Sequence, residues 1–155
     1  MTTSKTVAKL LSARHQTLAT AESCTGGLLS HTLTNIPGSS NFYRGGVVAY
    51  ANDIKVRFIG VPAGLIQKYG AVSAQVARAM AEGIRKKTKA DFSLAVTGIA
   101  GPSGGTRTKP VGLVFIAGAT LRQTSLKRFI FKGTRLQIKA QAAKAALGLL
   151  LKLIR

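Results

Sequence analysis

The segment Ala21-Glu22-Ser23-Cys24-Thr25-Gly26-Gly27 separates a short apolar and β-branched run from a helical pattern of leucines. The run predicts a strand over Thr17–Glu22, and the leucines predict a helix over Thr25–Asn35. A strand that breaks into hydroxyl side chains and paired glycines before a helix is typical of the ligand-binding edge of an open α/β sheet. The helix N-terminus at such an edge also attracts anions. We therefore expect the functional site at this junction.

The composition is that of one globular domain covering residues 1–155. The hydrophobic fraction is 46%, and the chain is long enough to bury a core. No apolar run has the length of a membrane span, and the N-terminal residues do not have the pattern of a secretion signal. The one cysteine, Cys24, excludes an internal disulfide and suits a reducing compartment. We expect a cytoplasmic protein that does not bind a membrane.

The net charge is extreme. The chain has 23 Lys and Arg against 4 Asp and Glu, which gives a formal charge of +19. Such a charge favours anionic partners of any kind. The basic residues are spread from Lys5 to Arg155 without a tail or a stripe, and the densest cluster, 85–89, is typical of a solvated helix C-terminus. With few aromatic residues and no recognition motif, we expect nucleic acid to be an unlikely partner.

The rest of the chain alternates predicted helices and strands. Helices are predicted over Ser4–Arg14 and Asp53–Phe58, after Ser73, and after Thr134. Strands are predicted over Gly46–Asn52, Phe92–Thr97, Val111–Ala119 and Ser125–Lys132. Only a brief turn separates the last two strands, so we expect them to pair antiparallel. The pattern predicts a three-layer α/β/α sandwich with a five-stranded mixed sheet.

Ser23 is the first candidate nucleophile. It precedes Thr25, Gly26 and Gly27, whose N–H groups are candidates to bind an oxyanion or a phosphate. A plain helix N-cap is the alternative interpretation of hydroxyl residues at this position. Cys24 is a rival nucleophile because a helix N-terminus lowers the pKa of a thiol. A small buried residue is the more common role for such a cysteine.

Ser40, Tyr50 and Lys55 form a second candidate set. Ser40 lies in a turn-forming loop, whereas Tyr50 and Lys55 lie near the end of a predicted strand. A serine nucleophile needs a base, which is usually histidine, but His15 precedes the first strand and His31 lies inside a helix. Lysine is the alternative base, since burial and nearby cations lower its pKa. Tyr50 would relay a proton or orient the pair.

Two further segments favour an anionic ligand. The loop Gly98–Thr108 is rich in glycine, which lets backbone amides approach a ligand closely. Gly133-Thr134-Arg135 places a capping residue and an arginine at the start of a helix, which suits a phosphate. A capped helix with a solvated arginine explains the same pattern equally well. Two histidines, one cysteine and four scattered acids predict no metal site.

Taken together, these segments resemble the CinA C-terminal domain family, the nicotinamide-nucleotide amidohydrolases. The resemblance implies hydrolysis of the carboxamide of nicotinamide mononucleotide to nicotinic acid mononucleotide and ammonia, in pyridine nucleotide recycling and without a cofactor. It also implies a three-layer sandwich with a five-stranded mixed sheet and a homo-oligomer. The matching segments are Ala21–Gly27, Pro37–Ser40, Tyr50–Asn52 with Lys55, Gly70–Ser73, Gly98–Pro102 and Lys109–Gly112.

The resemblance points to Ser40, Tyr50 and Lys55 as the catalytic core and to Arg135 as the residue that holds the phosphate. The residues themselves leave Ser23 and Ser40 open as the nucleophile, and we predict Ser40. The predicted substrate-binding residues are Ser23, Thr25, Gly26, Gly27, Gly98, Gly101 and Arg135.

One position departs from the family pattern. Ala74 stands where relatives often have Glu after the Val-Ser pair, which bears on the rate more than on the class of reaction. The alternative hypothesis is a catalytically decayed module, related to competence/damage-inducible protein CinA, that binds anions or nucleic acid.

Overall fold

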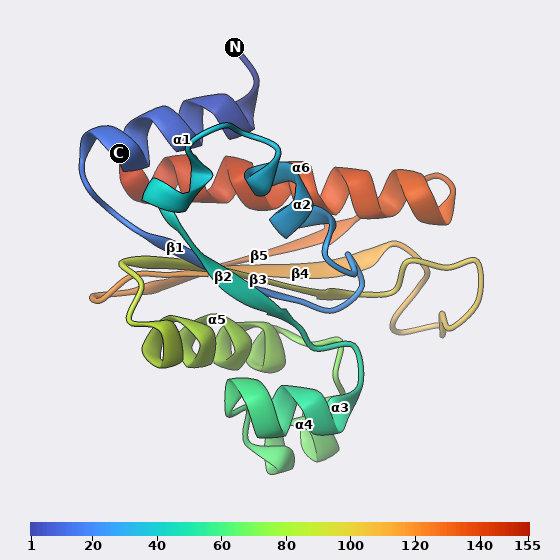
Figure 1. Ribbon diagram of the computed structural model, residues 1–155. Helices are drawn as coiled ribbons and strands as arrows, with labels where there is room; N and C mark the ends of the chain where they lie inside the picture. The colour runs from blue at the N-terminus through green and yellow to red at the C-terminus, as the bar shows by residue number, and fades with distance from the viewer.

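A mixed sheet of five strands lies between two layers of helices in the computed structural model, which describes residues 1–155 (Figure 1). The strand order is β2-β1-β3-β4-β5. The first three strands are parallel, and the last two are antiparallel to their neighbours. This confirms the predicted α/β class, the mixed sheet and the antiparallel final pair. The strands are β1 (Leu18–Glu22), β2 (Tyr43–Val48), β3 (Phe92–Gly98), β4 (Leu113–Ala119) and β5 (Thr124–Ile130).

The helices cover both faces of the sheet (Figure 1). On one face lie α1 (Thr3–Ala13), α2 (Leu28–Thr34) and α6 (Arg135–Ile154). On the other face lie α5 (Ala74–Thr88) and, beside it, α3 (Asn52–Ile54), η2 (Lys55–Ile59) and α4 (Ala63–Tyr69); η1 (Ser39–Asn41) precedes β2. None of the helices combines the length and the apolar character needed to span a bilayer.

Each face of the sheet has its own apolar core. One core of 22 buried residues packs α1, α2 and α6 against the sheet, and a second of 14 packs α5 on the opposite face. The central strands β1 and β3 are therefore buried almost throughout, whereas the outermost strand β2 alternates half-buried and exposed residues. The predicted caps of α5 and α6 are confirmed, because the hydroxyls of Ser73 and Thr134 accept from the N–H groups of Val76 and Gln137.

Some element boundaries differ from the predictions. Helix α2 begins at Leu28 rather than at Thr25, because Gly26 and Gly27 have φ of 59° and 101°, in the left-handed region that ends regular right-handed helix. Strand β2 begins at Tyr43 and ends at Val48, earlier than the predicted 46–52. The predicted helix 53–58 is a single turn, α3, that continues into the wider turn η2.

The register of the parallel strands gathers three chain segments at one edge of the sheet. Glu22 pairs with Val48 on one side and with Val96 on the other. The residues that follow β1, β2 and β3 therefore leave the sheet side by side (Figure 1). Those that follow β3 form the long loop between β3 and β4. This carboxyl-terminal edge is where open α/β sheets bind ligands. The starts of β1, β2 and β3 and the β4–β5 turn lie at the opposite edge.

Candidate active site

A cleft of about 220 Å³ lies at the carboxyl-terminal edge of the sheet. Segments from five parts of the chain line it: the residues after β1, the residues after β2, the end of β3 with the loop that follows, the turn before α5, and the first residue of α6. The fold thus brings together groups that are more than a hundred residues apart in sequence. The lining residues are Ser23, Cys24, Tyr50, Asn52, Lys55, Ala71, Val72, Thr97, Gly98, Ala100 and Arg135.

Ser23 and Lys55 form a direct pair in this cleft. The Lys55 Nζ lies 3.0 Å from the Ser23 Oγ, and it donates to the carbonyl oxygens of Ala49 at 2.8 Å and Tyr50 at 3.1 Å. The Lys55 side chain is 1% exposed and Ser23 is 8% exposed. Lys55 is the first residue of η2, which packs against α5, and its side chain is buried.

The surroundings of Lys55 favour its neutral form. Its three polar partners are a hydroxyl and two carbonyls, with no carboxylate among them. Burial therefore lowers the pKa of the Lys55 ammonium from its ordinary value of 10.5, and the nearby Cys24 opposes this as the smaller of the two effects. A neutral amine has two N–H bonds and one lone pair. Since the two carbonyls can only accept, they take the two N–H bonds, and the lone pair is left to face the Ser23 hydroxyl.

Cys24 is a poor nucleophile in this environment. Its side chain is buried, and burial together with the nearby Glu22 raises the pKa of the thiol to about 11, a shift that its own backbone N–H and the nearby Lys139 and Lys55 only partly oppose. At neutral pH the sulfur is therefore protonated and only weakly nucleophilic. The structure thus supports the interpretation of Cys24 as a small buried residue.

Tyr50 and Arg135 meet at the mouth of the cleft. One guanidinium nitrogen of Arg135, Nη2, donates to the Tyr50 hydroxyl at 2.8 Å, and the other, Nη1, donates to the Gly101 carbonyl at 2.7 Å. The Tyr50 side chain is 58% exposed. A guanidinium has five N–H bonds, so three of those of Arg135 are free to bind an anion. Tyr50 touches Lys55 through its carbonyl, whereas its hydroxyl faces Arg135.

The N-terminus of α2 is occupied by a side chain of the protein itself, which corrects the prediction of an anion site at Thr25–Gly27. The buried Glu22 carboxylate accepts from the N–H groups of Leu29 at 2.8 Å and Ser30 at 3.0 Å, and from the Ser30 hydroxyl at 2.6 Å. These N–H groups would otherwise attract a phosphate.

Thr25, Gly26 and Gly27 lie beside the cleft and not in its lining. Thr25 is fully buried, and its hydroxyl has no hydrogen-bond partner. Gly26 and Gly27 form the left-handed turn that leads into α2.

The structure does not bring Ser40 to this cleft. Ser40 lies in η1, before the first residue of β2, whereas Tyr50 and Lys55 follow the last residue of the same strand. The six residues of β2 span about 20 Å at about 3.3 Å per residue. Because β1 and β2 are parallel, Ser40 lies at the edge of the sheet opposite to Ser23. This placement corrects the expectation that Ser40 stands beside Lys55.

The two predicted glycines of the β3–β4 region have different roles. Gly98 lines the cleft and has no room for a side chain, since a Cβ there would lie 2.7 Å from the Leu113 carbonyl oxygen. Gly101 has φ of 75° and presents its carbonyl to Arg135.

Sequence reasoning missed Thr97 and Asn52, which also line the cleft. The Thr97 hydroxyl donates to the Ala71 carbonyl at 2.9 Å, which ties the end of β3 to the turn before α5. Both residues are the last of their predicted strands, at the end where open α/β sheets bind ligands, and this position was the signal that could have found them. No group of three His, Cys, Asp or Glu side chains that could hold a metal ion occurs in the chain.

Comparison with known proteins gives one consistent result. A family model described as the CinA C-terminal domain matches residues 1–154. A putative competence-damage inducible protein of Moorella thermoacetica is 50% identical over 146 residues, and a CinA-like protein of Desulfotalea psychrophila is 52% identical over 149 residues. These matches cover 94% and 96% of this chain but 35% and 36% of the relatives, so the chain spans about a third of their length.

Solved structures of the same kind superpose closely. The competence/damage inducible protein CihA from Agrobacterium tumefaciens matches with a TM-score of 0.97 and 37% identity, over 99% of this chain and 94% of that one. A CinA superfamily protein from Klebsiella pneumoniae matches with a TM-score of 0.94 and 34% identity, over 98% and 95% of the two chains.

Proposed function

We propose that this chain, which belongs to the CinA C-terminal domain family, is a nicotinamide-nucleotide amidohydrolase that converts nicotinamide mononucleotide to nicotinic acid mononucleotide and ammonia. The observation that carries the proposal is the buried Lys55 amine 3.0 Å from the Ser23 hydroxyl, with carbonyl partners and no carboxylate. A neutral lysine beside a serine can activate the hydroxyl as a nucleophile for amide hydrolysis.

Ser23 is the nucleophile in this proposal. Its Oγ attacks the carboxamide carbon while its proton passes to the lone pair of the Lys55 amine. The resulting ammonium then donates this proton to the carboxamide nitrogen as the carbon–nitrogen bond breaks, which releases ammonia and leaves an acyl ester on Ser23. Water attacks the ester with Lys55 again as the base, and the acid product leaves with the serine hydroxyl restored.

The turn after Ser23 supplies donors for the oxyanion. The Gly26 N–H donates to the Ser23 carbonyl, whereas the N–H groups of Cys24 and Thr25 donate to no backbone carbonyl. An N–H group directly after the nucleophile is a common place for an oxyanion donor. We assign this role to the Cys24 N–H.

Arg135 and Tyr50 bind the phosphate in this proposal. The guanidinium is already oriented by the Gly101 carbonyl and the Tyr50 hydroxyl, and its free N–H bonds suit a phosphate oxygen. The mononucleotide would thus enter with its amide toward Ser23 and its phosphate at the mouth of the cleft.

The experiment is a measurement of ammonia release from nicotinamide mononucleotide, with nicotinamide riboside as the substrate that lacks the phosphate. We expect turnover of the mononucleotide, much weaker turnover of the riboside, and no turnover of the mononucleotide by the Lys55→Met variant. The Lys55→Met variant should still bind the mononucleotide. Absence of ammonia release by the wild-type protein, or normal turnover by Lys55→Met, would contradict the proposal.

A further inference from the structure

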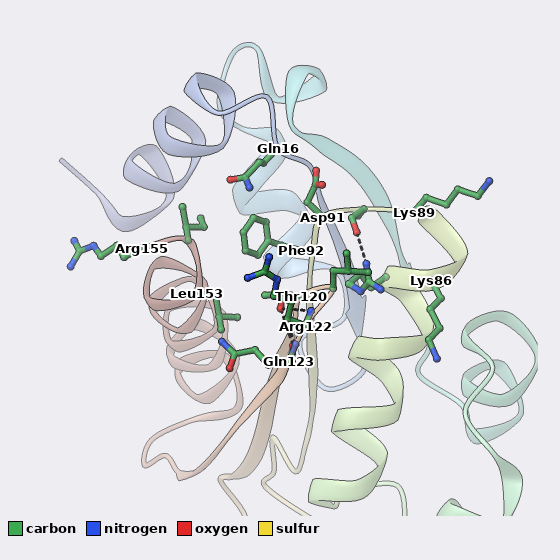
Figure 2. Close-up of a pocket in the computed structure, with 14 residues that line it drawn as sticks. Gln16, Lys86, Lys89, Asp91, Phe92, Thr120, Arg122, Gln123, Leu153 and Arg155 are labelled. Atoms are coloured by element: carbon green, nitrogen blue, oxygen red, sulfur yellow. Dashed lines mark hydrogen bonds between the residues drawn. The ribbon is translucent and has the colours of Figure 1, made fainter.

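A second hollow lies at the opposite edge of the sheet. It has a volume of about 930 Å³ and lies between the C-terminal ends of α5 and α6, at the start of β3 and beside the β4–β5 turn (Figure 2). A smaller hollow of about 280 Å³ shares Arg85, Lys86 and Arg122 with it and extends along α5 to Arg78. We call the two together the basic groove. Its cationic residues are Arg78, Arg85, Lys86, Lys89, Arg122 and Arg155.

The fold gathers these cations from separate parts of the chain. Arg122 comes from the β4–β5 turn, Arg155 follows α6, and the others come from α5 and the residue directly after it. In Figure 2, Lys86 and Lys89 extend outward from α5, and Arg122 lies between the ends of α5 and α6. The expectation that nucleic acid is an unlikely partner depended on basic residues without a stripe. The fold instead places Arg122 against the 85–89 cluster.

The acids of the groove are already engaged by neutral donors. The Glu82 carboxylate accepts from the Thr124 hydroxyl at 2.8 Å, and the Asp91 carboxylate accepts from the Thr17 N–H at 2.7 Å and the Thr17 hydroxyl at 2.8 Å. Lys86, Lys89 and Arg122 are exposed, with no hydrogen bond from any of these side-chain cations to an acid. With six cationic side chains against these two carboxylate side chains, the lining of the groove has an excess of positive charge.

The extent of the groove indicates a long polyanion. From Arg78 to Lys89 the cations follow α5 for about 16 Å at about 1.5 Å per residue, more than a single phosphate group spans. Exposed cations along an open groove bind phosphates through release of counterions. The one aromatic residue of the groove, Phe92, is 6% exposed and offers no face on which a base could stack.

We propose that the basic groove binds the phosphodiester backbone of nucleic acid without sequence preference. This binding is separate from the proposed hydrolysis, since the seven residues of β3, about 23 Å at about 3.3 Å per residue, lie between the two edges of the sheet. The binding can therefore be tested whether or not the chain releases ammonia.

The test compares two variants of equal charge. In the groove variant, Lys86→Gln, Lys89→Asn and Arg122→Gln remove three cations; asparagine is chosen at 89 because this residue has φ of 53°, which asparagine tolerates. In the control variant, Lys5→Gln, Lys9→Gln and Lys144→Gln remove three exposed cations from α1 and α6. Each variant has a formal charge of 19 − 3 = +16. Thermal unfolding verifies that both are folded.

Binding is measured by fluorescence anisotropy of a labelled mixed-sequence DNA of about 20 nucleotides, single-stranded in one arm and duplex in the other, from about 50 mM to about 200 mM salt. We expect the salt slope of log Kd for the single strand to fall by about 2 in the groove variant, since each lost phosphate contact removes about 0.7. The duplex slope should fall by about 3. The control variant should keep the wild-type slope.

Equal weakening in both variants would overturn the proposal, because it would show diffuse attraction by net charge. Failure of the wild-type protein to bind either DNA at about 150 mM salt would also overturn it. A third overturning result would be binding of phosphatidylserine vesicles through the same three cations with no binding of DNA. If the protein binds both DNAs, the one with the lower Kd shows whether the groove prefers the backbone of single-stranded or of duplex nucleic acid.

Discussion

Lys55 and Ser23 carry the proposed chemistry at the scale of single residues. Two backbone carbonyls, those of Ala49 and Tyr50, accept hydrogen bonds from the lysine amine, so that its lone pair faces the Ser23 hydroxyl. Ser40 has the same side chain but lies at the other edge of the sheet. The two serines therefore make a matched pair for mutagenesis.

Ser23→Ala should lower kcat for nicotinamide mononucleotide by at least about 10³-fold, as removal of a nucleophile does in other hydrolases. Ser40→Ala should leave kcat and KM near the wild-type values. Ammonia release under steady-state conditions measures both variants. Loss of activity in Ser40→Ala with a fully active Ser23→Ala would instead place the nucleophile at Ser40. Because Ser40 and Lys55 of one chain lie at opposite edges of the sheet, the serine would then have to come from a second copy of the chain.

The pH dependence of catalysis should report the buried lysine. Lys55 acts as a base in its neutral form, and burial lowers its pKa below 10.5. We therefore expect kcat/KM to rise with pH and to level off above the lowered pKa of Lys55. The measurement is a pH profile of kcat/KM for the mononucleotide. A profile that still rises through pH 10.5 would show that Lys55 keeps an ordinary pKa.

The same burial makes stability depend on pH. Between the lowered pKa of the folded state and 10.5, the unfolded chain holds one more proton at Lys55 than the folded chain, so the free energy of unfolding rises with pH in this window. The Lys55→Met variant lacks this contribution. Its free energy of unfolding relative to wild type should therefore fall by up to about 1.4 kcal/mol per pH unit as the pH rises through the window. Urea unfolding of both proteins at several pH values tests this, and parallel curves would contradict it.

At the scale of elements, the strand β1 fixes the start of the helix that follows it. The Glu22 carboxylate, at the last residue of β1, accepts from two N–H groups of the first turn of α2. The Ser30 hydroxyl then joins this carboxylate to the hydroxyls of Thr20 and Tyr43. This network holds the turn that contains Ser23 in place between β1 and α2.

Glu22→Ala should therefore lower the free energy of unfolding by about 1–3 kcal/mol, because it leaves buried N–H groups and hydroxyls without their acceptor. Glu22→Gln keeps one acceptor oxygen and should lower it less. Urea unfolding at neutral pH measures both. Equal destabilisation of the two variants would indicate that the charge of the carboxylate, and not its role as an acceptor, stabilises α2.

The sequence predicted the elements of the site better than their exact contacts. Tyr50, Lys55 and Arg135 were placed at strand ends and a helix start, and parallel strands bring such positions to one edge. Ser40 was misplaced because the proximity of its loop to Tyr50 and Lys55 in sequence was taken for proximity in space, whereas a loop that precedes a parallel strand lies at the opposite edge from the residues that follow that strand. The cap of α2 was missed because Thr25 has a strong preference for that role, while the carboxylate that takes it comes from β1, three residues earlier.

At the scale of the whole molecule, the order of strands and helices was predictable because periodicity and turn residues define them locally. The distribution of charge was not, since it depends on which surface segments the fold brings together. Arg122 and the 85–89 cluster are more than thirty residues apart in sequence, yet they line one groove. The 23 Lys and Arg residues against 4 Asp and Glu also give the molecule as a whole a positive charge, which attracts anions to its surface, including the mouth of the cleft.

This net charge should accelerate the encounter with an anionic substrate. Nicotinamide mononucleotide carries a phosphate, whereas nicotinamide riboside carries only the positive charge of its pyridinium ring. Because the screening length falls from about 30 Å at 0.01 M salt to about 8 Å at 0.15 M, kcat/KM for the mononucleotide should fall by about tenfold over this range. The value for the riboside should stay constant or rise, and kcat for the mononucleotide should not change, since salt acts on the encounter and not on the bound complex. A parallel fall for both substrates would show that salt disturbs the site itself, and constant values for both would show that the charge does not steer the substrate.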